Sequence, residues 1–292
     1  MTPRQIRSVL KVMEVGSVQR AAQELHLAPS SISAQIRELS SELGVTLFET
    51  CGRGIVPSAA ARQLQQSFSA MHALSEEISQ IANSIAHQPT GTLKLYAPSS
   101  MCIYRLPPLI EALQHTAPTV EIVLTHEPFN YAHALLNVEI DAALTVTETI
   151  SDEWATVPLH QEEVIYVCHP ERYQAQSLSV EQLNQHPIIT TEPQCTYRVR
   201  AEAHFRSHGL QLRPRQSFAN VEVIKRCLYA NMGIGLLPKC VVEQDVQQGH
   251  LQQQKVDGAP YLFYSALAYP KNRTVSPKLA AFLQVVKQYA TL

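Results

Sequence analysis

The chain of 292 residues lacks any apolar run near the roughly 18–20 residues that a membrane-spanning helix requires. Its start, Met1 to Arg7, has no apolar segment behind a basic one, so it does not resemble a signal peptide. Its six cysteines form no CxxC pair, and no cysteine–histidine spacing matches a zinc site. These absences predict a cytoplasmic protein with free thiols, no membrane contact, no metal and no cofactor.

Charged residues are also scarce. They make up 16% of the chain against 45% apolar residues, which predicts a packed core rather than disorder. The net charge of −2 does not by itself favour a nucleic-acid partner. Residues 1–37, however, hold five basic and two acidic groups, a net of +3. Because this excess is modest, DNA binding has to be argued from a motif.

The first 58 residues have the pattern of three short helices and a wing. Gly16 and Gly44 are placed to end helices, Ser17 to cap one, and Pro29 to begin one. A glycine-flanked Arg53 lies at the tip of an expected hairpin. The expected helices and hairpin cover residues 3–15, 17–25, 29–43 and 45–57.

A long helix is predicted over residues 59–86, capped by Ser58. At 1.5 Å per residue it spans roughly 40 Å. Its apolar residues follow steps of three and four, a near-heptad stripe: Leu64, Phe68, Met71, Leu74, Ile78, Ile81 and Ile85. We favour a dimer seam along this stripe over packing against its own chain. Residues 88–91 (Gln-Pro-Thr-Gly) break the pattern and indicate a hinge.

From Thr92 onward, short apolar strands alternate with helices, the pattern of an α/β domain with parallel strands and crossover helices. Two similar halves joined by crossing strands would leave a cleft between them, although no internal repeat supports the symmetry. Strands are expected at 93–97, 120–125, 142–146, 164–168, 188–191, 216–218, 233–238, 251–255 and 261–268. Helices are expected near 106–115, 132–138, 198–208, 220–231 and 276–290.

The N-terminal residues carry a family signature. The segments Gly16–Leu25, Ile32–Ile36 and Leu39, followed by Glu42–Val45 and Leu47–Glu49, closely resemble the DNA-binding signature of LysR-type transcriptional regulators. Small Ala21 and Ala22 suit close packing of two helices. The wing, the linker helix and the α/β domain extend the resemblance over the entire chain. The chain departs from the usual pattern at Ser40, Thr50 and Ala61, which weakens individual DNA contacts rather than the resemblance.

This resemblance implies a sequence-specific transcription regulator and not an enzyme. It implies α/β architecture with an all-α N-terminal part: a winged helix-turn-helix over 1–58, a linker and dimerisation helix over 59–87, a hinge over 88–91, and over 92–292 an effector-binding domain of two periplasmic-binding-protein-like subdomains. It further implies a dimer through the linker helices, assembled as a tetramer, that binds double-stranded DNA at an interrupted inverted repeat. A small-molecule effector would shift the arrangement of the dimer arms.

The third helix is expected to contact DNA with short polar, amide and guanidinium groups that suit phosphates and base edges. Arg53 at the wing tip is expected to reach a minor groove or a phosphate. The expected DNA-binding residues are Ser30, Ser31, Ser33, Gln35, Arg37 and Arg53.

Ligands of open α/β folds bind beyond the carboxyl ends of strands. Three segments here follow such ends and supply the expected effector-binding residues: Ser99, Ser100 and Met101, then Thr147, then Cys195, Thr196 and Arg198. The alternatives are helix capping by the serines, a polar loop at Thr147 and a structural ion pair at Arg198. Hydroxyls with one nearby arginine favour a small polar or anionic effector. His126 and Asn220–Val221 could complete the cleft.

Two other functions remain open. The position of Cys195 resembles that of the reactive cysteine in peroxide-sensing relatives. A regulator that senses oxidants through Cys195 is therefore the alternative. The second cysteine of those relatives has no counterpart, since His204 stands about there and the next cysteine is Cys227. A third hypothesis is a binding protein or enzyme built on the C-terminal part. Such a binding protein would need a signal peptide. Such an enzyme would need a histidine and an acid placed beside Ser99 or Ser100.

Overall fold

The computed structural model describes the chain except residues 52–53, 87–88, 129, 151 and 291–292, and without the side chains of residues 51 and 80–86. An N-terminal unit takes in residues 1–88 together with 136–139, and a C-terminal unit takes in residues 89–135 and 140–292. Among the described residues, no helix is both long and apolar enough to cross a membrane.

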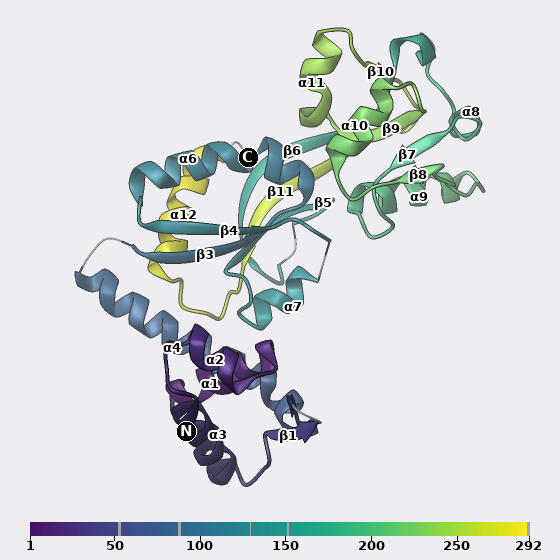
Figure 1. Ribbon diagram of the computed structural model, residues 1–292. Helices are drawn as coiled ribbons and strands as arrows, with labels where there is room; N and C mark the ends of the chain where they lie inside the picture. The colour runs from purple at the N-terminus through teal and green to yellow at the C-terminus, as the bar shows by residue number, and fades with distance from the viewer. Residues whose placement is uncertain (52–53, 87–88, 129, 151, 291–292) are drawn as a thin grey trace. The chain divides into compact units, whose positions relative to one another are not determined.

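The N-terminal unit contains the three predicted helices and the hairpin (Figure 1, purple and blue). The hairpin strands pair antiparallel. Gly16 and Gly44 end their helices in the left-handed region, at φ 66° and 68°, which glycine adopts without a Cβ clash. The elements are α1 (Pro3–Val15), α2 (Val18–Glu24), α3 (Pro29–Leu43), β1 (Phe48–Cys51) and β2 (Gly54–Pro57).

One apolar core holds this unit together. Ala21 and Ala22 of α2 are fully buried, and their small side chains let α2 lie close to its neighbours. The face of α3 that turns inward carries Ile32, Ile36 and Leu39. The opposite face of α3 is therefore the face left for a partner.

The linker helix α4 (Ala59–Ala86) begins as predicted, because the Ser58 hydroxyl accepts a hydrogen bond from the Ala61 N–H at 3.1 Å. The prediction that its whole apolar stripe forms a seam is wrong for the first half. Phe68 is buried in the core of the N-terminal unit, and Leu64 and Met71 pack against that core. Farther along, Leu74 and Ile78 are 56% and 61% exposed. Among the described side chains of the stripe, Leu74 and Ile78 are the ones left for another helix, and the side chains of Ile81 and Ile85 lie outside the described residues.

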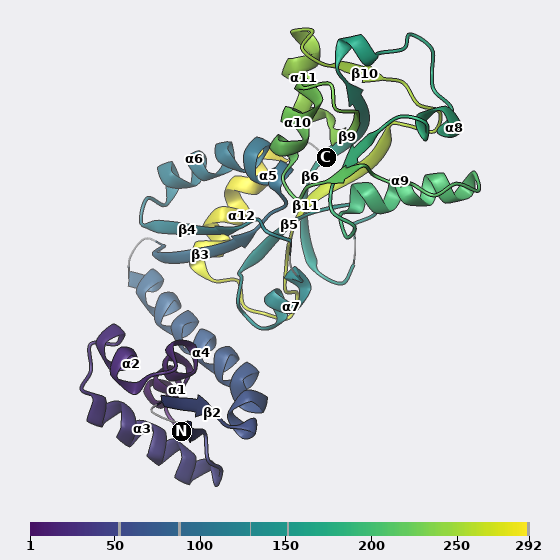
Figure 2. The same cartoon turned by 45° about the vertical axis from the view of Figure 1, so that its right-hand side comes forward.

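The C-terminal unit is built on one mixed sheet with two halves (Figures 1 and 2). Within each half the strands run parallel, β3 with β4 and β5, and β7 with β8 and β9. Strands β6 and β11 pair antiparallel and run through both halves. In sheet order the strands are β4 (Val120–Thr125), β3 (Gly91–Tyr96), β5 (Ala142–Thr147), β11 (Tyr261–Tyr269), β6 (Ala155–Cys168), β9 (Ile234–Pro238), β7 (Ile188–Thr190) and β8 (Gln216–Ser217), while β10 (Gln252–Gln254) pairs with β6.

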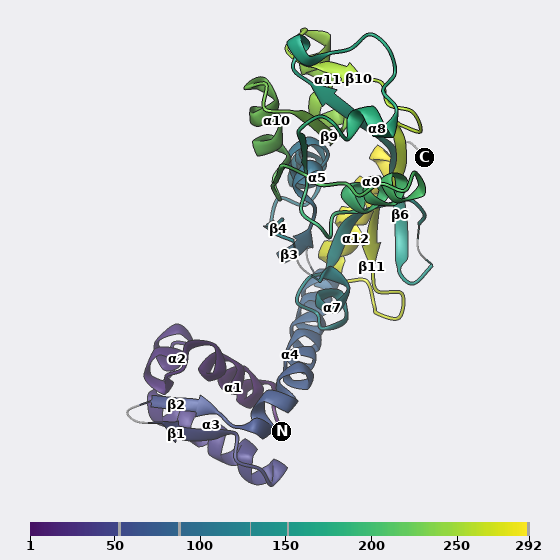
Figure 3. The ribbon, with the colours of Figure 1, turned by 90° about the vertical axis from the view of Figure 1, so that its right-hand side faces the viewer.

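Helices cover both faces of the second half. Neighbouring residues of β7 point to opposite faces, so Ile188 joins a core with Phe205 of α9, and Ile189 joins a core with Ile224 of α10. Figure 3 shows α9 and α10 on opposite sides of these strands. The helices of this unit are α5 (Ser99–Tyr104), α6 (Leu106–Thr116), α7 (Tyr131–Leu136), α8 (Val180–Leu183), α9 (Thr196–Ser207), α10 (Val221–Tyr229), α11 (Lys239–Gln247) and α12 (Pro277–Tyr289), with a 3₁₀ turn at Pro170–Arg172.

The structure confirms the predicted fold class and corrects some elements. Strand β6 begins at Ala155 rather than Val164, because Pro158 and the charged run after it disguise a strand that pairs with β11. Within that run, Glu162 is only 2% exposed. Helices α5, α8 and α11 were not predicted. Helices α5 and α8 have only six and four residues, and α11 buries only the adjacent Val241 and Val242, which show no helical period.

Candidate functional site

The outer face of α3 carries the expected DNA-binding residues. Ser30, Ser31 and Arg37 are exposed, and Ser33 is half-buried. Gln35 is also half-buried, and its side-chain carbonyl accepts a 2.5 Å hydrogen bond from the buried Ser8 hydroxyl of α1. Sequence reasoning missed Ser8, whose position on the buried face of α1 was the available signal. Arg53 lies outside the described residues.

A cleft of about 160 Å³ lies at the carboxyl ends of β3 and β5, against the start of α9. Both halves of the C-terminal unit line it. The first half supplies Tyr96, Pro98, Pro128, Tyr131 and residues 144–147, and the second half supplies Glu192, Gln194, Cys195, Thr196 and Tyr197.

Three of the seven expected effector residues meet in this cleft: Thr147, Cys195 and Thr196. The serine segment does not line it. The Ser99 hydroxyl donates to the Ala219 carbonyl at 3.0 Å and accepts from the Val221 N–H at 3.3 Å. Ser100 lies behind the cleft, with its hydroxyl 3.3 Å from that of Tyr197. Met101 is fully buried in the core. The serines therefore join the two halves of the unit, and Val221 takes part through its backbone N–H. Asn220 instead caps α10, where its side-chain oxygen accepts from the Glu222 N–H at 2.8 Å.

The expected arginine is likewise withdrawn from the cleft. The Arg198 guanidinium bonds Glu202 at 2.7 Å, the Thr191 carbonyl at 3.2 Å and the Ser217 hydroxyl at 3.0 Å. Arg198 therefore forms a structural ion pair and is not available to hold an anionic effector in the cleft. His126 is exposed beside Glu127, at 3.5 Å, and does not line the cleft.

Sequence reasoning missed the aromatic and acidic walls of the cleft. Tyr96 and Tyr131 stack with ring centroids 5.6 Å apart and planes 11° from parallel. Glu192 has one oxygen, Oε2, shielded from solvent with no hydrogen-bond partner in the part of the chain that the structure describes. Burial raises the pKa of the Glu192 carboxyl and raises that of Tyr96 to about 12. The sequence could have indicated these two residues, because Tyr96 ends β3 and Glu192 lies just after β7.

Cys195 precedes the first residue of α9 and lines the cleft. Burial raises the pKa of its thiol more than the neighbouring Thr191 and the backbone N–H groups of Tyr197 and Arg198 lower it. His204, which stands about where peroxide-sensing relatives carry a second cysteine, is buried, with Nδ1 2.8 Å from the Tyr261 hydroxyl. Because its pKa is raised above that of an ordinary thiol, the Cys195 side chain is protonated at neutral pH.

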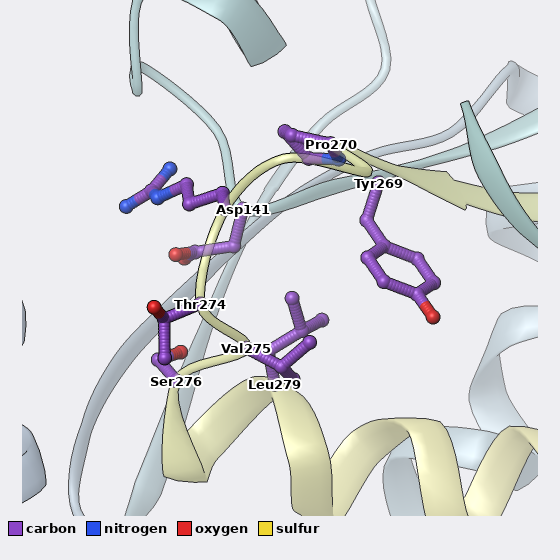
Figure 4. Close-up of a pocket in the computed structure, with 8 residues that line it drawn as sticks. Asp141, Tyr269, Pro270, Thr274, Val275, Ser276 and Leu279 are labelled. Carbon is purple, nitrogen blue, oxygen red and sulfur yellow. The ribbon is translucent and has the colours of Figure 1, made fainter. Parts of the chain in front are cut away.

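Other hollows fit a ligand less well. Figure 4 shows Asp141, Thr274 and Ser276 around a space of about 10 Å³, which suits at most one water. A hollow of about 440 Å³ at Arg105 and Lys239 is open and polar, and its cations already bind Glu162 and Glu163 at 2.8 and 3.0 Å. Another, of about 420 Å³, lies along residues 253–260 of the second half alone. Within the described residues, no group of three histidine, cysteine or acidic side chains could hold a metal ion.

A winged helix-turn-helix joined by a long helix to a two-lobed α/β unit with a cleft defines a DNA-binding regulator with a ligand-sensing domain. Family models agree: "Bacterial regulatory helix-turn-helix protein, lysR family" matches residues 3–62, and "LysR substrate binding domain" matches residues 86–291. The chain belongs to the LysR family of transcriptional regulators. Such regulators bind DNA and small-molecule effectors and form oligomers, and they are not enzymes.

Individual relatives span nearly the whole chain. An uncharacterised HTH-type transcriptional regulator of Bacillus subtilis, YwqM, is 28% identical over 91% of this chain and 92% of its own. The structure of full-length CbnR with its target DNA has a TM-score of 0.69 at 19% identity, covering 99% of this chain and 100% of CbnR. A full-length OxyR variant from Pseudomonas aeruginosa has a TM-score of 0.71 at 19% identity, covering 99% and 94%.

Proposed function

We propose that this chain controls transcription through a small polar effector that binds in the cleft between the two halves of residues 92–292. The observation that carries this proposal is the position of the cleft, at the carboxyl ends of β3 and β5, with walls from both halves. A ligand that touches both halves binds best to one arrangement of them. It therefore shifts the population toward that arrangement, with a coupling of about 1–3 kcal/mol.

The other parts of the chain have separate roles in this proposal. Residues 1–58 bind double-stranded DNA, residues 59–87 dimerise, and residues 88–91 are the hinge. Two copies joined through α4 would present two α3 helices to an interrupted inverted repeat. The exposed Leu74 and Ile78 support this seam. A tetramer of two dimers would present two such pairs of α3 helices. Because it acts on the chromosome, we place the protein in the cytoplasm.

The first prediction concerns the DNA face. Replacing Arg37 by alanine should weaken operator binding about 10–100-fold, because a good guanidinium contact to a base is worth about 1–3 kcal/mol. Arg37 is exposed on α3, so the fold should be unaffected. The measurement is a fluorescence anisotropy titration against a duplex selected from random sequences by the wild-type protein.

The matched control is Arg206→Ala, which removes the same charge from an exposed position on α9. The control should bind the selected duplex within twofold of the wild type. Equal affinity of Arg37→Ala and wild type would remove Arg37 from the DNA interface. Ser30, Ser31, Ser33, Gln35 and Arg53 are the further proposed contacts. For Gln35 the side-chain NH₂ would make the contact, because Ser8 holds the carbonyl oxygen.

The second prediction concerns the redox alternative. Because burial raises the pKa of Cys195, iodoacetamide should label it at pH 7 about tenfold more slowly than glutathione. Peroxide should leave the operator affinity of the wild type unchanged, and Cys195→Ser should behave the same. Mass spectrometry follows the labelling. Sulfenic acid at Cys195, together with a peroxide response that Cys195→Ser abolishes, would replace the effector proposal by redox sensing.

A further inference from the structure

The carboxylate of Glu192 is the least satisfied polar group of the cleft. Its Oε2 is shielded from solvent and has no hydrogen-bond partner among the described residues. A shielded carboxylate oxygen without a donor costs free energy. The position follows β7 and leads into α9, so the fold holds Glu192 at the cleft wall. The cleft therefore has an acceptor that calls for a donor.

The neighbouring cations do not supply that donor. Arg198 is held by Glu202 and two oxygen acceptors of the second half, and Arg200 pairs with Glu148 at 2.8 Å. Burial raises the pKa of Glu192 most, the charge of Arg198 lowers it, and the negative charge of Glu127, outside the cleft, raises it. An anionic ligand would meet this negative charge in a partly desolvated site, which Coulomb repulsion opposes.

The remaining walls suit a cation. The rings of Tyr96, Tyr131 and Tyr197 line the cleft, and aromatic faces attract ammonium groups. Thr145 also lines the cleft, and because its hydroxyl proton is donated to the Ala266 carbonyl at 3.3 Å, its oxygen is left to act as an acceptor. A volume of about 160 Å³ holds several water molecules, and hence a molecule of amino-acid size.

We infer that the effector carries a protonated primary amine, which donates to Glu192 among the tyrosine rings. This inference rests on the proposed function and names the chemical class of its ligand. An ammonium has three donors, one for Glu192 and others for the threonine oxygens of the β5 end. Free amino acids and simple amines share this group, and the experiment separates them.

The test uses the full-length protein at pH 7 with two probe sets. One contains the twenty amino acids and small amines such as ethanolamine and putrescine. The other contains the carboxylates and alcohols that lack the amine, such as propionate beside alanine. Isothermal titration calorimetry gives each affinity. At least one amine should bind, and its amine-free analogue should bind at least tenfold more weakly. Binding by amino acids alone, or by amines without a carboxylate, identifies the source.

Three variants locate the contact. Glu192→Gln keeps the shape and removes the charge, so it should weaken amine binding about 10–100-fold, the loss of one charged hydrogen bond. Glu111→Gln, an exposed site on α6, should not change it. Thr196→Trp, at an exposed position on the cleft wall, should abolish it by filling the cleft. Melting temperatures of all three show that the fold is kept.

The outcomes separate the inference from the proposed function. If no amine binds, if an amine-free analogue binds as tightly, or if Glu192→Gln binds with unchanged affinity, the amine inference is overturned. In these cases, if Thr196→Trp abolishes the binding of the ligands that the wild-type protein does bind, the cleft remains the effector site. Binding that survives Thr196→Trp would place the ligand elsewhere and overturn the proposed function itself.

Discussion

Replacing Leu74 and Ile78 by aspartate is expected to convert the dimer that we propose into a monomer and to lower operator affinity about 10²–10⁴-fold. The two side chains lie four residues apart, so they share one face of α4, and both are largely exposed in the single chain. Four carboxylates facing one another across a helix pair would repel, and the apolar contact would be lost. A monomer offers one α3 helix, and the gain from binding two half-sites disappears.

The control for this experiment is Ser75→Asp with Ser79→Asp. This variant adds the same charge at the neighbouring positions along α4, each turned about 100° around the helix axis from Leu74 or Ile78. Light scattering measures the mass, and anisotropy measures operator binding. The control should remain a dimer with near wild-type affinity. A dimeric Leu74→Asp/Ile78→Asp protein would show that another surface joins the copies, and it would remove α4 as the seam.

Local features of this chain could be predicted because their causes are local. Gly16, Gly44 and Ser58 mark helix ends through backbone conformation and capping, and the structure places the ends there. The division of the α4 stripe could not be predicted in this way. Phe68 and Leu74 have the same helical spacing and similar apolarity, and only the position of the winged-helix core decides that one is buried and the other exposed.

The residues of the cleft, likewise, could be predicted only in part. The sequence indicated three segments near strand ends, and Thr147, Cys195 and Thr196 do meet there. Ser99 and Ser100 do not, because their hydroxyls bond partners more than ninety residues away. Arg198 had a nearer warning: Glu202 lies four residues on, the spacing of a helical ion pair. Both residues lie within the helix predicted at 198–208, so this pair could have been predicted from the sequence.

A buried ion pair fixes the last helix to the sheet. Lys278 of α12 and Asp141 at the start of β5 have side chains only 10% and 11% exposed, with Nζ 3.0 Å from Oδ2. Lys278 also donates to the Thr92 carbonyl at 2.5 Å, and Asp141 accepts from the Lys94 N–H at 2.8 Å. Both charges are thus paired and hydrogen-bonded, the condition under which burial of charge is tolerated. Loss of one partner leaves the other charge without compensation.

Lys278→Met should therefore lower the free energy of unfolding of the C-terminal unit by about 3–5 kcal/mol, measured by urea denaturation followed with circular dichroism. Lys287→Met removes an exposed lysine from the same helix and should change it by less than about 0.5 kcal/mol. The double variant Asp141→Asn/Lys278→Met should lose less than the two single variants summed, because neither charge is then stranded. A loss below about 1 kcal/mol for Lys278→Met would mean that water reaches Asp141 and replaces the lysine, so that α12 is held by its apolar face alone.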